Sequence, residues 1–437
     1  MLPHSFRLLL ALLLALLSLG PAQATPRGDD SIIYRVAQGD NLYTLAERNF
    51  RRPADYIVVQ RLNRVVDPRR LPVGMLLTIP RSLLRQEPVD AVVQSFRGSV
   101  LAGTGHNLRR VEVGMRVREG DRIETGSKSF ITLRLPDGSN VALPSQTSLR
   151  VERLRRTLMA GSVERSFRIE RGRAGATVTP MEDPHSEFLF STPTAVSAVR
   201  GTRFRMRYDP AEHRASSEVL EGKVAFAAAD GTTELPAGFG IANGLSGPVP
   251  LLPPPELVSP GRVQDEEQLH FELKPLAEAK SYHLQIAADA GFIDVLDEAT
   301  ASSPEAFMEA LSNGDYFVRA TAIDANGLEG LPAIYAFHRR LNRIEASAEE
   351  VHSGRYRQYL FRWRAPDANN PRYRFQLSTA PDGAKPLVDE AVRETAFVVT
   401  DLPSGTYYWR VETIDIDEGR AYEKWSPFQE LRIEGAQ

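Results

Sequence analysis

The strongest constraint on the fold is an internal repeat in the C-terminal part of the chain. Two segments recur at an offset of 91 residues, 282–287 at 373–378 and 314–324 at 405–415. Apolar and polar residues alternate within both copies, a pattern typical of strands that bury one face. A repeat of about 90 residues built from such strands predicts a β-sandwich. We therefore expect two tandem β-sandwiches, over 257–340 and 341–437.

The preceding segment, 95–247, also alternates with period two. The alternation runs on both sides of Asp137-Gly138 and again around Asp230-Gly231, and Asp-Gly accepts the positive φ angles of a tight hairpin turn. No long helical pattern competes, so we expect an all-β domain. The proline-rich stretch 248–256 then predicts a stiff, extended linker.

Residues 32–80 follow another pattern. An alternating start at 34–36 and a polar turn precede apolar residues at helical spacing within 42–46. A second helical pattern, 55–62, leads to an apolar run of strand length at 75–79. The order strand, helix, helix, strand predicts a small α+β module, so that the whole chain is expected to be multidomain and mainly β.

This module resembles a LysM domain from end to end. The resemblance rests on Tyr34-x-Val36-x-x-Gly39-Asp40-Asn41-Leu42, then Asn63, then Leu71-x-x-Gly74-x-x-Leu77-x-Ile79-Pro80. Asn41 stands where the family more often has threonine, and both residues can cap the following helix. LysM domains bind glycans containing N-acetylglucosamine in a shallow groove between two loops. The resemblance implies a peptidoglycan site formed by Gly39, Asp40, Asn41, Leu42, Asn63 and Leu71, although Gly39 and Asp40 also serve as a turn and helix cap.

Two further resemblances cover the rest of the chain. Segment 95–247 resembles the FecR domain through Val117-x-x-Gly120-Asp121, Leu135-x-Asp137-Gly138-Ser139, Arg200-Gly201-Thr202-Arg203-Phe204 and Val219-Leu220-Glu221-Gly222. In the iron-signalling regulators that name the family, this domain lies in the periplasm behind a transmembrane helix and a sigma-factor-binding tail. We find neither here and expect only a periplasmic β-domain. Trp363 and Tyr407-Tyr408-Trp409 look like core positions of a fibronectin type III fold, which the two sandwiches resemble.

Residues 1–24 read as a secretory signal peptide. A basic start is followed by the apolar run Leu8–Leu19 and by Ala22-Gln23-Ala24, which a signal peptidase accepts. We expect cleavage after Ala24 and a periplasmic mature chain. An uncleaved membrane anchor is the alternative, but the apolar run is shorter than the roughly 20 residues of a bilayer span. The chain has no cysteine, which excludes disulfides, thiolate metal sites and a lipoprotein anchor.

The sequence contains no catalytic or cofactor motif that we recognise. The eight histidines lack metal-ligand spacing, and no nucleophile elbow, P-loop or dinucleotide fingerprint is present. We therefore expect no enzyme activity, no metal and no cofactor. Asp415 and Asp417 share one strand face and could bind a cation, but a solvated sandwich edge is the simpler interpretation.

The distribution of charge points to binding partners only for individual segments, not for the whole chain. The net charge of −3 gives no reason to expect nucleic-acid binding. Within 32–80, eight arginines oppose four acidic residues, and this net charge of +4 would attract the carboxylates of wall peptides or simply form a solvated face. Arg203, Arg205 and Arg207 lie on one strand face, which is either exposed or meets an acidic partner.

The leading hypothesis is a non-enzymatic periplasmic scaffold or adaptor that binds peptidoglycan and presents its β-domains to an envelope protein. The alternative is a periplasmic sensor or regulatory protein that acts through the FecR-like domain. A wall hydrolase is a third possibility, and it would require muralytic activity.

Overall fold

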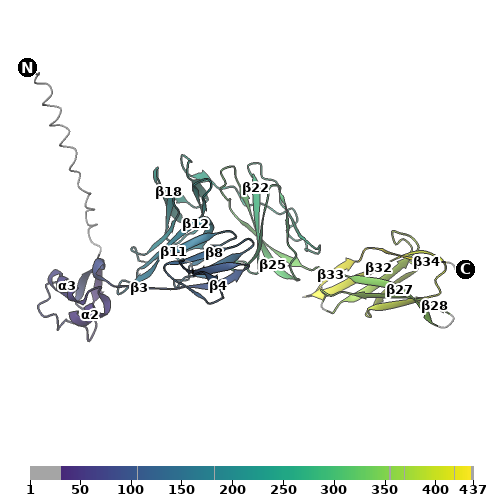
Figure 1. Cartoon of the computed structure of the whole chain (residues 1–437), viewed down its shortest axis with the longest axis horizontal. Helices are drawn as coiled ribbons and strands as arrows, with labels where there is room; N and C mark the ends of the chain where they lie inside the picture. The colour runs from purple at the N-terminus through teal and green to yellow at the C-terminus, as the bar shows by residue number, and fades with distance from the viewer. Residues whose placement is uncertain are drawn as a thin grey trace, which may run out of the picture. The chain divides into compact units, whose positions relative to one another are not determined.

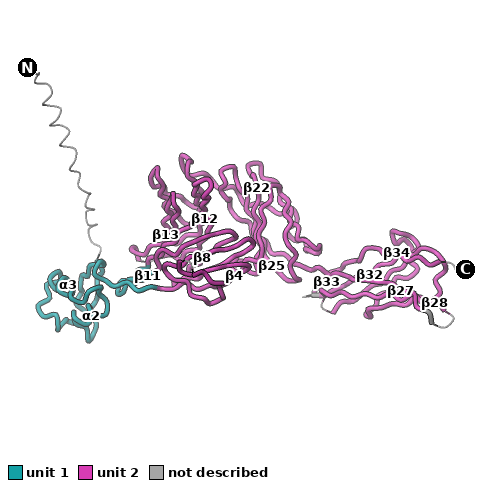
Figure 2. Tube along the Cα trace, in the orientation of Figure 1, with its two compact units in different colours: residues 1–88, 155–163 teal, residues 89–154, 164–437 magenta. Residues whose placement is uncertain are grey.

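The computed structural model describes residues 31–105, 107–181, 183–353, 356–368, 370–417 and 419–434. The predicted signal peptide, 1–24, lies outside these residues. The chain divides into two compact units (Figure 2): unit 1 is 1–88 with 155–163, and unit 2 is 89–154 with 164–437. Among the described residues, no helix combines the length and the apolar character that a membrane crossing requires.

Unit 1 contains the small α+β module. Its elements are β1 (Ser31–Arg35), α2 (Leu42–Asn49), η2 (Pro53–Asp55), α3 (Tyr56–Leu62), β2 (Leu76–Pro80) and η3 (Arg81–Leu83). The residues of unit 1 also include β3 (Gln86–Pro88), which is a strand of the barrel sheet. β1 and β2 pair antiparallel, with Ile32 opposite Ile79. Both of these side chains are buried, and together with Leu42 and Val59 they join the sheet to the two helices in one core. The predicted order of strand, helix, helix, strand is confirmed.

In unit 2, strands β4 to β20 belong to a closed barrel (Figure 1). Their bounds are β4 (Ala91–Arg97), β5 (Val100–Thr104), β6 (Arg109–Arg110), β7 (Arg116–Val117), β8 (Asp121–Thr125), β9 (Phe130–Arg134), β10 (Asn140–Leu143), β11 (Ser148–Thr157), β12 (Val163–Thr177), β13 (Glu187–Ser191), β14 (Ala195–Val199), β15 (Arg203–Asp209), β16 (Arg214–Glu221), β17 (Lys223–Ala228), β18 (Gly231–Pro236), β19 (Phe239–Ala242) and β20 (Val249–Pro250).

Both predicted hairpins are present in the barrel. β9 pairs with β10 across Asp137-Gly138, and Gly138 has φ +84°, as the turn requires. β17 pairs with β18 around Asp230-Gly231. The period-two pattern along β15 is also confirmed, because Phe204, Met206 and Tyr208 all point into the barrel core.

Residues 248–256, for which we expect a stiff extended linker, make hydrogen bonds to neighbouring strands. Val249 and Pro250 form strand β20, which pairs with β19. The backbone N–H of Leu251 donates to Gly238 O at 2.8 Å, and Leu252 O accepts from Leu331 N at 2.9 Å. Leu251 and Leu252 are both buried. The leucines of this segment, rather than its prolines, determine its environment, since burying them against strands is favourable.

The first sandwich follows the barrel. Its strands are β21 (Leu269–Glu272), β22 (Ser281–Ala287), β23 (Val295–Ala301), β24 (Glu305–Met308), β25 (Gly314–Ile323) and β26 (Ala333–Arg339). They form a two-stranded sheet, β21-β24, and a four-stranded sheet in the order β23-β22-β25-β26. Leucine, phenylalanine and tyrosine side chains from both sheets fill one core between them.

The second sandwich repeats this plan. Its strands are β27 (Glu345–Ser353), β28 (Tyr356–Arg364), β29 (Arg372–Ser378), β30 (Val388–Val392), β31 (Ala396–Thr400), β32 (Gly405–Asp417), β33 (Arg420–Trp425) and β34 (Gln429–Ile433). They form the sheets β27-β28-β31 and β30-β29-β32-β33, with β34 paired to β32. Trp363, Tyr407 and Trp409 lie buried in its aromatic core, as the fibronectin resemblance implies. We expect Tyr408 there too, but it is only half-buried, because successive residues of β32 point to opposite faces of the sheet.

A pair of tyrosines shows that the two copies share more than a strand pattern. Tyr316 Oη donates to Ser312 O at 3.1 Å, and Tyr407 Oη donates to Pro403 O at 2.8 Å. Donor and acceptor are four residues apart in each copy, and the two tyrosines are related by the repeat offset. Such a bond from a tyrosine back to the backbone is typical of β-sandwiches and fixes the loop before the strand.

Candidate functional site

Two loops of unit 1 lie against each other and form the candidate site. One loop, 36–41, connects β1 to α2, and the other, 63–75, connects α3 to β2. Val36 N donates to Met75 O at 2.9 Å, and Gly74 N donates to Val36 O at 2.8 Å. Leu42 N donates to Pro68 O at 2.9 Å, which ties the far ends of the loops together. The backbone of both loops is therefore held in place by the module itself.

The predicted residues on the first loop mostly shape that loop. Asn41 is the N-cap of α2, where its Oδ1 accepts from Thr44 N at 2.9 Å. Leu42 is fully buried in the core and cannot meet a ligand through its side chain. Gly39 is exposed with φ +93°, a conformation that L side chains rarely adopt.

Asp40 closes the turn through its carboxylate. Its Oδ2 accepts from Tyr34 Oη at 2.8 Å and from Ala37 N at 2.7 Å. Burial raises the pKa of Tyr34, and the hydrogen bond and negative charge of Asp40 raise it further. The tyrosine therefore stays a protonated donor at neutral pH, and the turn keeps its shape.

On the second loop, Asn63 acts as a brace between α3 and β2. Its Nδ2 donates to Val59 O and to Thr78 O, both at 2.8 Å, while its Oδ1 accepts from Thr78 N at 2.7 Å. Leu71 is half-buried and packs against the core of the module. The structure brings Gly39, Asp40, Asn41 and Leu71 to the two facing loops, and it gives Asn63 a bracing role.

Val66, which the sequence interpretation did not single out, and Val73 are the most exposed apolar side chains of the second loop. Val66 has 96% of its surface exposed and Val73 has 69%. Apolar carbons of this kind can lie under the faces of sugar rings, while the exposed backbone at 37–39 offers hydrogen-bonding groups. The sequence feature that could have pointed to Val66 is the valine doublet Val65-Val66 inside a polar loop. In the structure, Val65 lies in the core and Val66 is exposed.

The positively charged side chains of the module all lie on its surface. All eight arginines between residues 32 and 80 are exposed, and Arg69 and Arg70 lie on the second loop itself. An anionic ligand approaching the loops would therefore meet positive charge that salt can screen.

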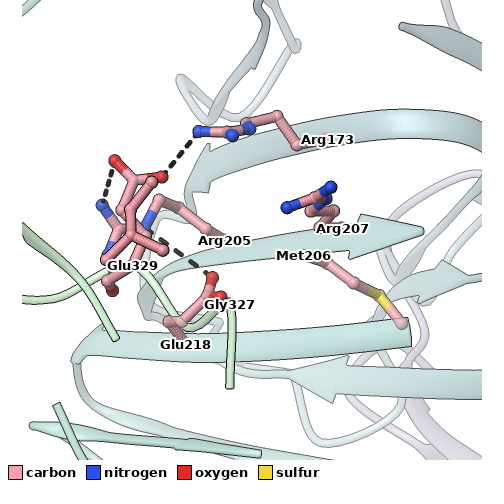
Figure 3. A pocket seen from close by; sticks show the side chains of 8 residues that line it. Arg173, Arg205, Met206, Arg207, Glu218, Gly327 and Glu329 are labelled. Carbon is pink, nitrogen blue, oxygen red and sulfur yellow. Dashed lines mark hydrogen bonds and ion pairs between the residues drawn. The ribbon is translucent and has the colours of Figure 1, made fainter. Parts of the chain in front are cut away.

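Unit 2 contains a second cluster of charged residues (Figure 3). The sequence left open whether the three arginines on β15 are exposed or meet an acidic partner. In the structure, Arg205 has an acidic partner in the same chain. Arg205 Nη1 lies 3.1 Å from Oε1 of Glu329, which comes from the loop between β25 and β26. Arg203 pairs with Glu221 and Arg207 with Asp209, both at the edge of the barrel.

Among the described residues, no group of three or more His, Asp or Glu side chains could hold a metal ion. Asp415 is buried rather than solvated, contrary to the expectation of an exposed sandwich edge. At this position β32 pairs with β33, and Asp415 lies opposite Tyr422.

Comparisons with known protein families match two parts of the chain. The pattern described as LysM domain matches residues 34–80, and the pattern described as FecR protein matches residues 121–225. The chain contains a LysM domain followed by a FecR domain. LysM domains bind peptidoglycan, FecR domains belong to envelope signalling and regulation, and neither family is catalytic.

Solved structures give weaker likenesses. A candidate anti-sigma factor from Parabacteroides distasonis is 23% identical, covers 29% of this chain and has a TM-score of 0.24. This chain spans 57% of its length. The two-domain fibronectin type III segment of chicken tenascin is 15% identical, with a TM-score of 0.22, and covers 40% of this chain and 98% of its own.

The FN1–FN3 segment of chicken CNTN1 is 11% identical, covers 71% of this chain and 99% of its own, and has a TM-score of 0.25. At TM-scores this low, the architecture of unit 2 rests on its own strands and sheets. Comparison with curated proteins gives no match.

Proposed function

We propose that this chain is a non-enzymatic periplasmic protein that binds peptidoglycan through its LysM domain and presents its barrel and sandwiches to an envelope protein partner. The observation that carries the proposal is the pair of facing loops, 36–41 and 63–75, held together by backbone hydrogen bonds. A shallow surface with fixed backbone groups suits a polysaccharide, since the protein loses little conformational entropy on binding.

Side-chain chemistry supports a glycan with attached acidic peptides. Val66 and Val73 supply exposed apolar carbons for sugar faces, and Gly39 leaves the backbone of the first loop accessible. Arg69 and Arg70 lie on the same loop as the valines and would attract the carboxylates of peptide stems. In this proposal Asp40, Asn41, Leu42, Asn63 and Leu71 act by holding the loops in position.

Sedimentation with insoluble peptidoglycan tests the proposal. We expect the mature chain, 25–437, to pellet with the polymer and the double variant Val66→Asp/Val73→Asp to remain in solution. Val113→Asp is the matched control, because this valine of the barrel is 67% exposed and its replacement has the same chemistry. If the double variant pellets as well as the control, the valines do not contact the glycan. If the unaltered chain does not pellet, the peptidoglycan proposal fails.

The FecR match favours a second candidate, a sensor in which the barrel receives a signal from a membrane partner. The two candidates differ in what the barrel contacts in the cell. Photo-crosslinking from exposed barrel positions such as Val113 separates them. An adduct with an integral membrane protein would favour the sensor, and adducts with soluble envelope proteins would favour the scaffold.

A further inference from the structure

The first sandwich is attached to the barrel through a buried carboxylate. Glu329 lies in the loop between β25 and β26, and it points at two barrel arginines (Figure 3). Arg173 Nη1 on β12 is 2.7 Å from Glu329 Oε2, and Arg205 Nη1 on β15 is 3.1 Å from Oε1. His283 Nδ1 on β22 lies 3.0 Å from Oε1. A carboxylate removed from water is stable only with partners of this kind.

The contact around Glu329 is extensive and specific. Arg205 Nη2 also donates to the carbonyl of Gly330 at 2.7 Å. On the other side, Thr132 Oγ1 of β9 donates to Ile293 O at 2.8 Å, and Phe130 packs with Phe292 and neighbouring side chains of the sandwich. The barrel and the first sandwich therefore meet through apolar, polar and ionic contacts together.

At their contact, the barrel and the first sandwich carry mainly opposite charges. Near the contact most cations, Arg173, Arg205 and Lys128, come from the barrel, and most anions, Glu329, Glu298 and Asp297, come from the sandwich. Glu218 of the barrel and Arg319 of the sandwich are the exceptions. Complementary charges of this kind favour one docked arrangement, and their effect depends on which groups carry a proton.

We propose that Glu329, Arg173, Arg205 and His283 form a proton-linked latch, which holds the first sandwich on the barrel in mild acid and loosens as the pH rises.

Two side chains at the latch can bind or release a proton near neutrality: His283 and one further group, Glu218 on β16. Glu218 is covered by the sandwich loop, with only a cavity of about 10 Å³ between it, Arg205 and Gly327. Its Oε2 is 3.8 Å from Arg205 Nε, which is beyond hydrogen-bonding distance. Charged groups facing these two are Arg173 of β12, Arg205 of β15, Glu298 of β23, Arg319 of β25 and Glu329 of the loop.

The pKa shifts give the direction of the linkage. Burial raises the pKa of Glu218 from 4.5 to about 7, against the opposing charge of Arg205. Burial disfavours the charged ring of His283, but Glu329 and Glu298 outweigh this effect and raise its pKa above 6.5. Glu218 binds its proton more tightly when docked, because docking covers it and brings the charge of Glu329 close, so docking weakens as pH rises from 4.5 to about 7. The two carboxylates that raise the pKa of His283 both belong to the sandwich, and the barrel adds only Arg173, which lowers that pKa, so His283 does not contribute to this weakening.

The carboxylates of the sandwich act in the opposite sense at lower pH. His283 lowers the pKa of Glu298 to about 2 despite its burial, and Arg205, His283 and Arg173 hold the pKa of Glu329 well below 4.5. Their contribution is complete above pH 4.5 and is lost only as the pH falls below that value. The docked state is therefore most stable in mild acid.

Distance measurements on the full mature chain test the latch. The chain has no cysteine, so Thr232→Cys on β18 and Ser302→Cys in the sandwich, both exposed, accept spin labels selectively. Pulsed electron–electron double resonance measures the distance between the two spin labels. We expect one narrow distance distribution at pH 5.5. By pH 8.5 a second, broad population should have grown at least about tenfold.

Variants identify the groups responsible. Glu329→Gln should show the broad population already at pH 5.5, whereas Glu218→Gln should stay docked and lose the pH response below 7. Glu256→Gln is the matched control, because Glu256 is an exposed carboxylate paired with Lys274 and should change nothing. Should a variant fail to fold, hydrogen exchange of residues 293–298 in the unaltered chain, corrected for intrinsic rates, must show declining protection across the same pH range. A single unchanged distance from pH 5.5 to 8.5, or release on acidification within that range, would overturn the proposal.

Discussion

The Asn63→Ala variant tests whether Asn63 stabilises the LysM domain or contacts the glycan. Its carboxamide makes three hydrogen bonds that join α3 to β2. Each is worth about 1 kcal/mol net, and partners left unpaired add to the cost, so we expect a loss of about 2 to 4 kcal/mol. A module of this size is stable by roughly 2.5 to 7.5 kcal/mol in total. The variant should therefore be close to unfolding in this module while the rest of the chain remains folded.

Hydrogen exchange in the full chain is the assay. Amides of β2, Leu76–Pro80, should lose protection by roughly 30- to 900-fold, which corresponds to the expected loss of free energy. Asn49→Ala is the matched control, since Asn49 makes a single side-chain hydrogen bond, to Leu45 O, and should cost about 1 kcal/mol or less. Peptidoglycan binding should fall only in proportion to the folded fraction. Unchanged protection together with abolished binding would refute the bracing role and make Asn63 a glycan contact.

Three other predictions concern binding, stability and activity. Because residues 32–80 carry a net charge of +4 on exposed arginines, the fraction of protein pelleted by peptidoglycan should fall as sodium chloride rises from 50 to about 500 mM; a flat profile would exclude an electrostatic contribution. Tyr407→Phe should lower the free energy of unfolding of the second sandwich by about 0.5 to 1.5 kcal/mol. All three tryptophans lie in that sandwich, so their fluorescence reports its denaturation, and Tyr316→Phe in the first sandwich serves as the matched control. Turbidity of a peptidoglycan suspension should not change with the purified chain, and clearing would contradict the non-enzymatic assignment.

Regular strand patterns made much of the fold predictable from the sequence. Alternation along Phe204, Met206 and Tyr208 correctly predicted which face of β15 is buried. The fibronectin resemblance correctly placed Trp363 and Trp409 in one core. These are local properties, since burial of alternate residues follows from the period of a strand.

The roles of several polar residues could not be predicted in the same way. Arg205 meets the carbonyl of Gly330 across a sequence separation of 125 residues, and strand periodicity does not reveal such a partner. Asn63 reaches Thr78 across 15 residues, so its bracing role depends on how α3 packs on the sheet. The motif located the two loops of the candidate site, but only burial separates Leu42, which is enclosed, from Val66, which is exposed.

Hydrogen exchange of the mature chain with soluble peptidoglycan fragments tests the central claim most directly. Binding to the two loops predicts new protection of the amides in 36–42 and 66–75, with no change in the barrel or the sandwiches. Protection confined to unit 2, or no protection at fragment concentrations that saturate the sedimentation assay, would contradict the claim that the LysM domain binds the wall.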